Sequence, residues 1–533
     1  MQPASPRRAP GISKLPEPLA RMLDLTPIFR LMARRRLSQL ARLDPAETQI
    51  RTLLALVRKA AATGFGRAHD FGSIGSVGEF QACVKLRRYE DFWAEFWREP
   101  FPHIGGVSWP GTIPYFAVTS GTTTGATKYI PCSADMLRAN VRASLDILTH
   151  HVARRPNSKL LGGRGFMLGG STNLVRQAPG INSGDISGIA AAELPWWINR
   201  RYFPSKEMAL ITDWEEKIAK LAPASLEVDI RTISGTPSWL LVFFDKLAAL
   251  RTELPHRLSS YYPNLELLIH GGVNFAPYRA QFEALLEGSR AELREVYPAS
   301  EGFIAVADRG SGEGMRMLLD TGLFYEFVPV EELESTNPTR HWIGNAETGV
   351  NYALVLSSNA GVWSYVLGDT VRLVSLDPPR LLVTGRTSYM LSAFGEHLIN
   401  EEIEEAVAKA AAAIGALVTD YSVGAVFPKK KGGLGHHLFI VEFADPAPGS
   451  TSLKRFTETL DADLSATNED YQAHRAGGIG LAPPRLQAPA PGTFASWMKK
   501  RGKLGGQHKV PRIITDETLF DDLRMFAKAR EVG

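Results

Sequence analysis

Apolar residues recur at helical spacing near the start of the chain and at mixed spacing further on. Helices are expected between residues 19 and 61, where ETQIRTLLALVRKAAATGFG (residues 47–66) predicts an amphipathic helix that ends at a glycine. The stretch YEDFWAEFWREPF (residues 89–101) predicts a short amphipathic helix stopped by a proline. From about residue 113 to residue 374, short apolar runs alternate with helical segments, which is typical of an α/β domain.

The pattern changes again beyond a junction at about residues 386–392. HLINEEIEEAVAKAAAAIGA (397–416) predicts a strong amphipathic helix, and DYSVGAVF (420–427) and HHLFIVEF (436–443) predict two strands joined by a polar turn. These elements indicate a separate, small α+β domain. We therefore predict an α/β fold with a flexible N-terminal arm at 1–18, a large domain of mixed sheets and helices at 19–388, and a smaller, mobile α+β domain at 389–533.

Composition narrows the class of protein. The 533 residues carry 60 basic and 56 acidic side chains, a net charge of +4, which is too balanced to predict a nucleic-acid partner. Two cysteines, Cys83 and Cys132, exclude a disulfide scaffold and suit a reducing compartment. No apolar stretch is long enough to span a membrane, and the Pro- and Arg-rich start does not resemble a secretory signal. We expect a cytoplasmic protein without a membrane partner.

The polar loop in YFAVTSGTTTGATKYIP (115–131) is the first candidate for chemistry. Clusters of Ser, Thr and Gly between apolar segments are usually ordinary turns. They also suit a phosphate cradle, because glycines let the backbone approach an anion, hydroxyls donate hydrogen bonds and a lysine neutralises charge. Lys128 comes too late after Gly125 for a Walker loop. The loop alone does not decide between these interpretations.

Four later stretches bear on that choice. Glu301 suits a turn that it caps, and equally a Mg²⁺ site beside phosphates. Asp369 follows a glycine and is typical of a turn, although a carboxylate there could also accept both hydroxyls of a ribose. Lys509 stands between Gly and Pro in a segment expected to be a loop, and a surface lysine is the ordinary interpretation there. The stretches are YPASEG (297–302), YVLGDTVRL (365–373), TGRTSYML (384–391) and GQHKVPRI (506–513).

The order of these five stretches resembles that of acyl-adenylate-forming enzymes. More narrowly, the chain resembles the Gretchen Hagen family of auxin-responsive acyl acid amido synthetases from about residue 47 to residue 512. The family's Ser-Ser-Gly-Thr-Ser-x-Gly-x-x-Lys corresponds to residues 119–128, its Tyr-x-Ser-Ser-Glu to 297–301, its Tyr-Arg-x-Gly-Asp to 365–369 and its Tyr-Lys-x-Pro-Arg to 508–512. Val366 and His508 replace an arginine and a tyrosine of these patterns.

The resemblance implies a large acyl-adenylate-forming domain like that of firefly luciferase-like enzymes. It also implies a ligase that uses ATP and Mg²⁺ to join a small carboxylic acid to the amine of an amino acid, releasing AMP and pyrophosphate. Glu301 would hold Mg²⁺ and, with Lys128 and Lys509, would act in catalysis. The residues implied in ATP binding are Thr119, Ser120, Gly121, Thr122, Thr123, Gly125, Lys128, Gly271, Gly272, Tyr297, Ser300, Asp369 and Arg386.

Other functions stay open on the sequence. One is a ligase that passes the acyl group to coenzyme A or to a carrier protein, and another is a nucleotide-binding protein without catalysis on the same scaffold. The chain has neither a His-Glu-x-x-His helix nor a Gly-x-Ser-x-Gly elbow. Phe166, Met167 and Trp239 are candidates for an apolar acid pocket, and core packing explains each of them equally well.

Overall fold

The structure is a computed structural model. It describes residues 22–120, 127–169, 174–193, 200–211, 214–272, 275, 278–310, 312–387, 390–391, 398–427, 434–444, 448–468, 471–472, 475, 481–503 and 510–531. The predicted N-terminal arm, 1–18, lies outside these ranges.

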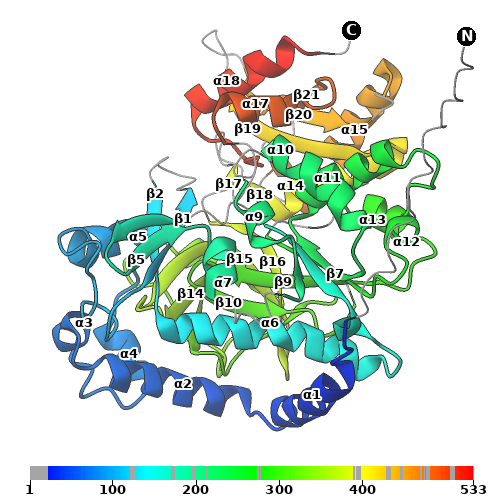
Figure 1. Ribbon diagram of the computed structural model, residues 1–533. Helices are drawn as coiled ribbons and strands as arrows, with labels where there is room; N and C mark the ends of the chain where they lie inside the picture. The colour runs from blue at the N-terminus through cyan, green and yellow to red at the C-terminus, as the bar shows by residue number, and fades with distance from the viewer. Residues whose placement is uncertain are drawn as a thin grey trace, which may run out of the picture.

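A mixed sheet forms the centre of the larger part of the molecule (Figure 1). Among the described residues it has 12 strands, in the order β13-β12-β14-β15-β16-β11-β10-β9-β8-β7-β3-β6. The strands from β6 to β9 pair in parallel, and those from β9 to β13 pair antiparallel. The parallel strands are β3 (Arg164–Leu168), β6 (Tyr202–Phe203), β7 (Ile230–Gly235), β8 (Leu267–Gly271) and β9 (Glu292–Ala299). The antiparallel strands are β10 (Gly302–Val306), β11 (Met315–Met317), β12 (Leu323–Pro329), β13 (His341–Trp342), β14 (Asn351–Ser358), β15 (Tyr365–Leu376) and β16 (Pro379–Arg386).

Helices cover both faces of the parallel half of the sheet. Successive side chains of β8 point to opposite faces, and each face is buried under helices. Leu267 and Ile269 pack with the helices of one face, and Leu268 packs with those of the other. Parallel strands need this double cover because both of their faces are apolar. The first face carries α1 (Thr26–Leu40) and α6 (Ala134–Arg154), and the second carries α10 (Trp214–Leu226), α11 (Pro237–Leu250) and α13 (Arg279–Leu286).

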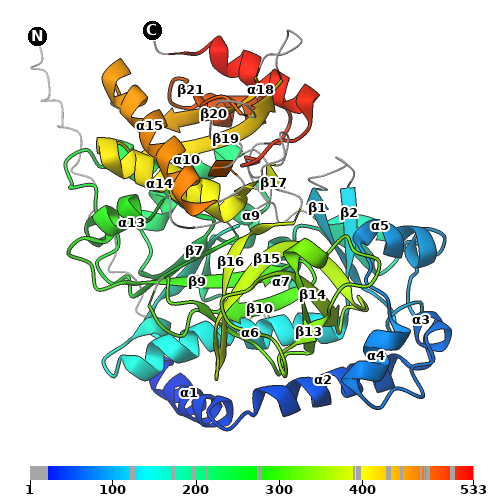
Figure 2. The ribbon, with the colours of Figure 1, turned by 180° about the vertical axis from the view of Figure 1, so that it is seen from behind.

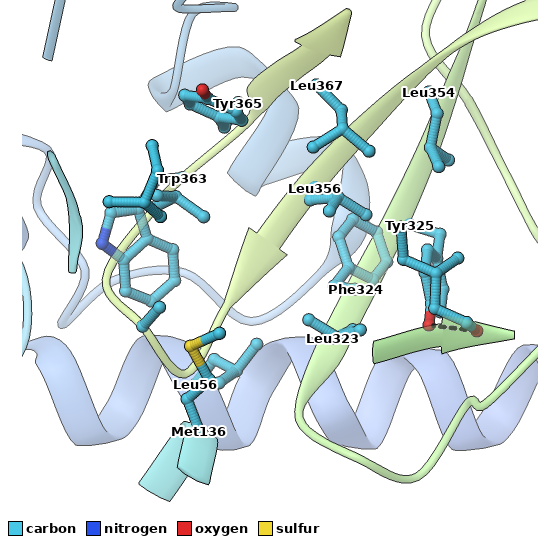
Figure 3. Close-up of a cluster of buried hydrophobic side chains, with 14 of the residues drawn as sticks. Leu56, Met136, Leu323, Phe324, Tyr325, Leu354, Leu356, Trp363, Tyr365 and Leu367 are labelled. Atoms are coloured by element: carbon cyan, nitrogen blue, oxygen red, sulfur yellow. Dashed lines mark hydrogen bonds between the residues drawn. The ribbon is translucent and has the colours of Figure 1, made fainter. Parts of the chain in front are cut away.

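Short helices from the start of the chain pack on the antiparallel half. The expected helix is confirmed as α2 (Pro45–Ala60), where Asp44 caps the backbone N–H of Glu47, but it ends before the predicted glycine, because Thr63 caps a new helix at Gly64. Figure 3 shows Leu56 of α2 in one cluster of buried side chains with Phe324 and Trp363. The following helices are α3 (Gly64–Ala68), α4 (Val77–Cys83) and α5 (Tyr89–Phe92), and α5 continues as a π-helical turn at Trp93–Trp97.

A smaller sheet stands beside the central one and carries the two ends of the polar loop. Its order is β2-β1-β5-β4 among the described residues. β1 pairs antiparallel with β2, so that Thr119 lies opposite Lys128 and Ser120 opposite Thr127. The strands are β1 (Tyr115–Ser120), β2 (Thr127–Cys132), β4 (Val175–Ala178) and β5 (Ile181–Gly184), and α7 (Ile186–Glu193) follows β5.

The C-terminal elements form a separate layer, seen above the large sheet in Figure 1 and from behind in Figure 2. The predicted helix is confirmed as α14 (Asn400–Ile414), and the two predicted strands are confirmed as the antiparallel pair β19 (Val418–Val426) and β20 (His436–Phe443). The other elements here are β17 (Met390–Leu391), β18 (Leu398–Ile399), α15 (Ser450–Thr467), β21 (Arg485–Gln487), α17 (Thr493–Lys500) and α18 (Glu517–Lys528). The α/β architecture with a large N-terminal and a smaller C-terminal part confirms the predicted fold class.

Candidate functional site

A cavity of about 1890 Å³ lies between the C-terminal ends of the parallel strands, the β1–β2 hairpin and the C-terminal layer. Twelve residues that the sequence analysis singled out line it, although they are spread over more than 260 positions of the chain. They are Thr119, Lys128, Phe166, Met167, Trp239, Gly271, Gly272, Tyr297, Ser300, Glu301, Asp369 and Arg386. Ligands of α/β sheets commonly bind at the C-terminal ends of parallel strands.

Some predicted site residues lie outside the described part of the chain. These are the centre of the polar loop, with Gly121, Thr122, Thr123 and Gly125, and the C-terminal Lys509. Ser120 ends β1, and nothing is described of its side chain. The structure therefore defines where the loop starts and ends, on paired positions of a hairpin.

Asp369 connects two other predicted residues. Its Oδ2 accepts a hydrogen bond from the Tyr297 hydroxyl at 2.5 Å, and its Oδ1 accepts one from Arg386 Nε at 2.9 Å. Asp369 and Arg386 are also register partners of β15 and β16. Burial, followed by the neighbouring Asp369 carboxylate, raises the pKa of Tyr297 well above its usual value, so this phenol stays a donor. The three side chains are held as one unit before any ligand binds.

The prediction of a turn at Gly368 and Asp369 is wrong. Both residues lie inside β15, which pairs with β14 on one side and with β16 on the other. The register of the β15–β16 pair shifts between Thr370 and Val371, and Gly368 has a φ of +90°, which favours glycine. The Gly-Asp pair therefore lies at an irregular position within a strand, where the same residue types are used as in a turn.

Glu301 is a buried carboxyl at the end of the β9–β10 hairpin. It is 6% exposed and hydrogen-bonds with Tyr365 of β15. Burial, with a contribution from the Asp369 charge, raises the pKa of Glu301 to about 7. The Arg386 charge and the Tyr365 hydrogen bond lower the pKa, but they do not offset the effect of burial. A Mg²⁺ ion held by one carboxylate, phosphate oxygens and water would fit this position.

Lys128 has a carboxylate partner in the ligand-free structure. Its Nζ lies 3.0 Å from Glu90 Oε1 and 5.1 Å from the centroid of the Tyr89 ring. The Tyr89 hydroxyl in turn accepts a hydrogen bond from the backbone N–H of Tyr129 at 2.9 Å. The lysine is therefore held at the base of the polar loop by residues of α5, which the sequence analysis did not connect with it.

The Gly271–Gly272 pair ends β8 beside Tyr297. A Cβ on Gly271 would lie 2.2 Å from the carbonyl oxygen of Val296, so the close approach of β8 to β9 requires glycine. Gly272 has a φ of +84°.

The three candidates for an apolar acid pocket differ in their packing. Phe166 is 1% exposed and packs edge-on against Phe203 and Phe243, so most of its surface belongs to the core. Met167, on the other face of β3, and Trp239, at the start of α11, are half-buried and line the cavity.

Two polar residues of the cavity wall were missed by the sequence analysis. His270 of β8 is 1% exposed, and Glu295 of β9 is its register partner. Both line the cavity. His270 is a polar residue in the otherwise apolar, buried strand β8, and that contrast was the available signal, whereas Glu295 lies in a strand that also carries Glu292 and Arg294.

The C-terminal layer contacts the wall of the cavity through Arg512. Its guanidinium donates to the Tyr278 hydroxyl at 2.6 Å, while its other nitrogen bonds Asp420 of β19. Gln281 Nε2 also donates to the carbonyl of Val418 at 3.3 Å. The contacts join the turn of α13 to the small sheet, close to the segment that contains Lys509 in sequence.

Three sequence models of one family match the chain. The GH3 family N-terminal domain matches residues 34–190, the central domain 316–386 and the C-terminal domain 401–518. The matched ranges include the β1–β2 hairpin, the strands β12 to β16 and most of the C-terminal layer. Together with the rest of the chain they form the fold of acyl acid amido synthetases. The chain belongs to the GH3 family.

Curated relatives are plant enzymes. The chain is 26% identical over 212 residues to the indole-3-acetic acid-amido synthetase GH3.8 of Oryza sativa subsp. indica, covering 36% of this chain and 33% of the relative. It is 27% identical over 241 residues to the probable indole-3-acetic acid-amido synthetase GH3.9 of Oryza sativa subsp. japonica, covering 41% and 53%. The alignments thus span about a third to a half of these relatives.

Solved structures agree over a longer stretch. The GH3.15 acyl acid amido synthetase in complex with 2,4-DB matches with a TM-score of 0.78 at 17% identity, covering 95% of this chain and 96% of that one. A 2-hydroxyisobutyryl-CoA ligase bound to 2-HIB-AMP matches with a TM-score of 0.61 at 16% identity, covering 90% and 91%. At these identities the likeness establishes the fold.

Two features are absent from the described residues. No helix in those ranges combines the length and apolar character that crossing a bilayer requires. The same ranges hold no group of three or more His, Cys, Asp or Glu side chains placed to bind a metal ion together.

Proposed function

We propose that this protein is an AMP-forming ligase that activates a small carboxylic acid with ATP and transfers the acyl group to the amine of an amino acid. The convergence of twelve predicted residues on one cavity carries the proposal. Membership of the GH3 family supports it, because curated relatives with this family's name are amido synthetases.

In the first step a carboxylate oxygen of the acid attacks the α-phosphorus of ATP, and pyrophosphate leaves. Both partners are anionic, so the protein's task is to hold them together and to offset their repulsion. Thr119, Ser120 and Lys128 would contact the phosphates together with the loop between them, including Gly121, Thr122, Thr123 and Gly125. Lys128 exchanges Glu90 for phosphate in this step, since its ion pair is partly solvent-exposed.

The nucleoside would lie on the strand ends. Gly271, Gly272 and Tyr297 flank the adenine, and Asp369 with Arg386 holds the ribose, where the Tyr297–Asp369–Arg386 unit is already formed. Ser300 completes the wall. Glu301 would hold Mg²⁺, which when bound offsets the negative charge of the phosphates.

In the second step the amine of the amino acid attacks the acyl carbon. The amine loses a proton, the C–O bond to phosphate breaks, and AMP leaves with the amide. Lys509 would serve the first step from the C-terminal domain, which we take to begin near residue 389 and to move about the 386–392 junction. We place this reaction in the cytoplasm.

The test is acid-dependent exchange of labelled pyrophosphate into ATP with a panel of aromatic and aliphatic acids, followed by AMP formation with amino acids or coenzyme A as acceptor. Exchange with amino-acid-dependent amide formation is the expected result. If coenzyme A supports AMP formation and amino acids do not, the second step is thioester formation and not amide formation. ATP binding without exchange for any acid would overturn the ligase and leave a nucleotide-binding protein.

A further inference from the structure

The inner wall of the cavity contains a pair of polar side chains that the reaction above does not use. His270 and Glu295 are register partners on the parallel strands β8 and β9, so their side chains point to the same face of the sheet. Neighbouring strands are about 4.8 Å apart. This face is the one covered by α11 and α13, where Leu268 packs two positions before His270.

Neither polar group has a hydrogen-bond partner among the described residues, although His270 is 1% exposed and Glu295 is half-buried. Neither ring nitrogen of His270 has a hydrogen-bond partner among the residues that the structure describes, and the ring stacks on Phe275 with centroids 3.8 Å apart. The carboxyl of Glu295 makes no hydrogen bond or ion pair within the same ranges. Buried polar groups in folded proteins are nearly always paired, so an unpaired couple on a cavity wall indicates a missing ligand group.

The couple lies deeper than the proposed nucleotide position. His270 directly precedes Gly271, and Glu295 comes two residues before Tyr297 on its strand. Two residues along a strand correspond to about 6–7 Å. An acid whose carboxylate meets the α-phosphate at the strand ends therefore extends its other end along this wall.

The charge states of His270, Glu295 and Arg279 restrict which chemical group the far end of the acid can carry. Burial, with the Arg279 charge as a second cause, lowers the pKa of His270 to about 3, so the ring is neutral and offers one donor and one acceptor. Burial raises the pKa of Glu295 to about 7, and the Arg279 charge opposes the rise. Arg279 attracts an anionic group that the Glu295 carboxylate repels, and the reverse holds for a cationic group, so the two charges together favour neither sign. A neutral group that both donates and accepts, such as a hydroxyl, fits both partners.

We propose that His270 and Glu295 form a specificity site for the acid substrate, which carries a neutral hydrogen-bonding group, above all a hydroxyl, at the end remote from its carboxylate. The inference rests on the proposed acid activation. A site built to hydrogen-bond a substrate hydroxyl rejects the analogue without it, because its own polar groups then stay unpaired.

The experiment compares matched acids. The pairs are para-hydroxyphenylacetate with phenylacetate, and terminally hydroxylated hexanoate with hexanoate. In pyrophosphate exchange, the wild type is expected to prefer the hydroxylated member by about 10²-fold in kcat/KM. In His270→Phe, which keeps a ring to stack on Phe275, the preference falls to within about threefold and kcat/KM for the hydrocarbon acid rises. His270→Gln, which can still donate and accept, restores part of the preference.

Controls separate this site from general effects. His341→Phe changes a histidine on β13 that does not line the cavity, and it should leave the preference at the wild-type value. Equal use of both members of each pair by the wild type would overturn the proposal. A hydroxyl preference that persists unchanged in His270→Phe would overturn it as well.

Failure of the proposed reaction is distinguishable from failure of this site. If no acid supports exchange, the same pairs are compared by isothermal titration of the acids against wild type and His270→Phe. Tighter binding of the hydroxylated acid that depends on His270 supports the site without the ligase reaction. Equal binding of both acids by the wild type overturns it.

Discussion

Glu301→Gln is the most informative single change, because it separates a stability effect from a functional one. The substitution keeps the shape of the side chain and an oxygen that can accept from Tyr365, and it removes the ability to ionise. Glu301 is buried, and its pKa is raised from 4.5 to about 7. Burial is the largest cause of the rise, and the Asp369 charge adds to it. The folded protein therefore resists ionisation of this carboxyl.

The magnitude follows from linkage. One pKa unit corresponds to about 1.4 kcal/mol, so the folded state loses about 3 kcal/mol at pH 8, where both folded and unfolded forms are ionised. Between pH 4.5 and pH 7 the folded state binds more protons than the unfolded state, so this loss grows as the pH rises. At pH 5 it is below about 1 kcal/mol. Glu301→Gln should thus stabilise the protein at pH 8 by about 3 kcal/mol and barely at pH 5.

The assay is urea unfolding of wild type and variant at pH 5 and pH 8, without nucleotide, together with pyrophosphate exchange at pH 8. The exposed Glu347→Gln, outside the cavity, is the control and should shift neither quantity. We expect the more stable Glu301→Gln variant to lose about 10²-fold or more in the rate of adenylation, because a neutral amide cannot balance the charge of a bound cation.

A Glu301→Gln variant that is less stable than wild type at pH 8 would show that the carboxylate makes a favourable contact in the folded state. Wild-type exchange rates in the same variant would remove Glu301 from the ATP site. Either result would refute the reasoning from burial to function.

Three further predictions concern the other parts of the cavity. Asp369→Ala should raise the apparent KM for ATP about 10- to 100-fold, as expected for loss of a charge-assisted hydrogen bond, and an unchanged KM in a folded variant would remove Asp369 from the site. Ser120→Ala and Lys128→Ala should each slow pyrophosphate exchange; wild-type exchange in both would make the loop an ordinary turn. Lys509→Ala should lose about 10²-fold in adenylation yet convert a supplied acyl-adenylate and amino acid at a near wild-type rate, measured by single-turnover kinetics. Equal losses in both half-reactions would show that Lys509 does not act in adenylation alone, and the model of two domain orientations would be wrong.

Local patterns predicted the elements well where one segment determines its own structure. The helix α14 and the strands β19 and β20 are such cases, since their apolar periodicity is complete within each segment. The pair Gly368–Asp369 is the opposite case. Its residue types favour a turn, but Asp369 pairs with Arg386 of β16, and the strand continues through a register shift opposite β14.

The site divides in the same way. Motif order singled out Lys128, Tyr297 and Asp369, and all three line one cavity, although they lie within the strands β2, β9 and β15 and not in turns. The placement of His270 beside Glu295 depends on the register of β8 and β9, which no local pattern contains. The partnership of Lys128 with Glu90 likewise joins two segments whose packing only the complete fold determines.

The bond between Arg512 and the Tyr278 hydroxyl has a consequence for the populations of domain orientations. A hydrogen bond to a charged group contributes about 1.5–3 kcal/mol, which corresponds to a ratio of about 10 to 100 between two states that differ by this bond. Arg512 lies three residues after Lys509 in the chain. For the domain movement proposed above, one phenolic oxygen is therefore enough to favour the orientation in which Arg512 meets Tyr278.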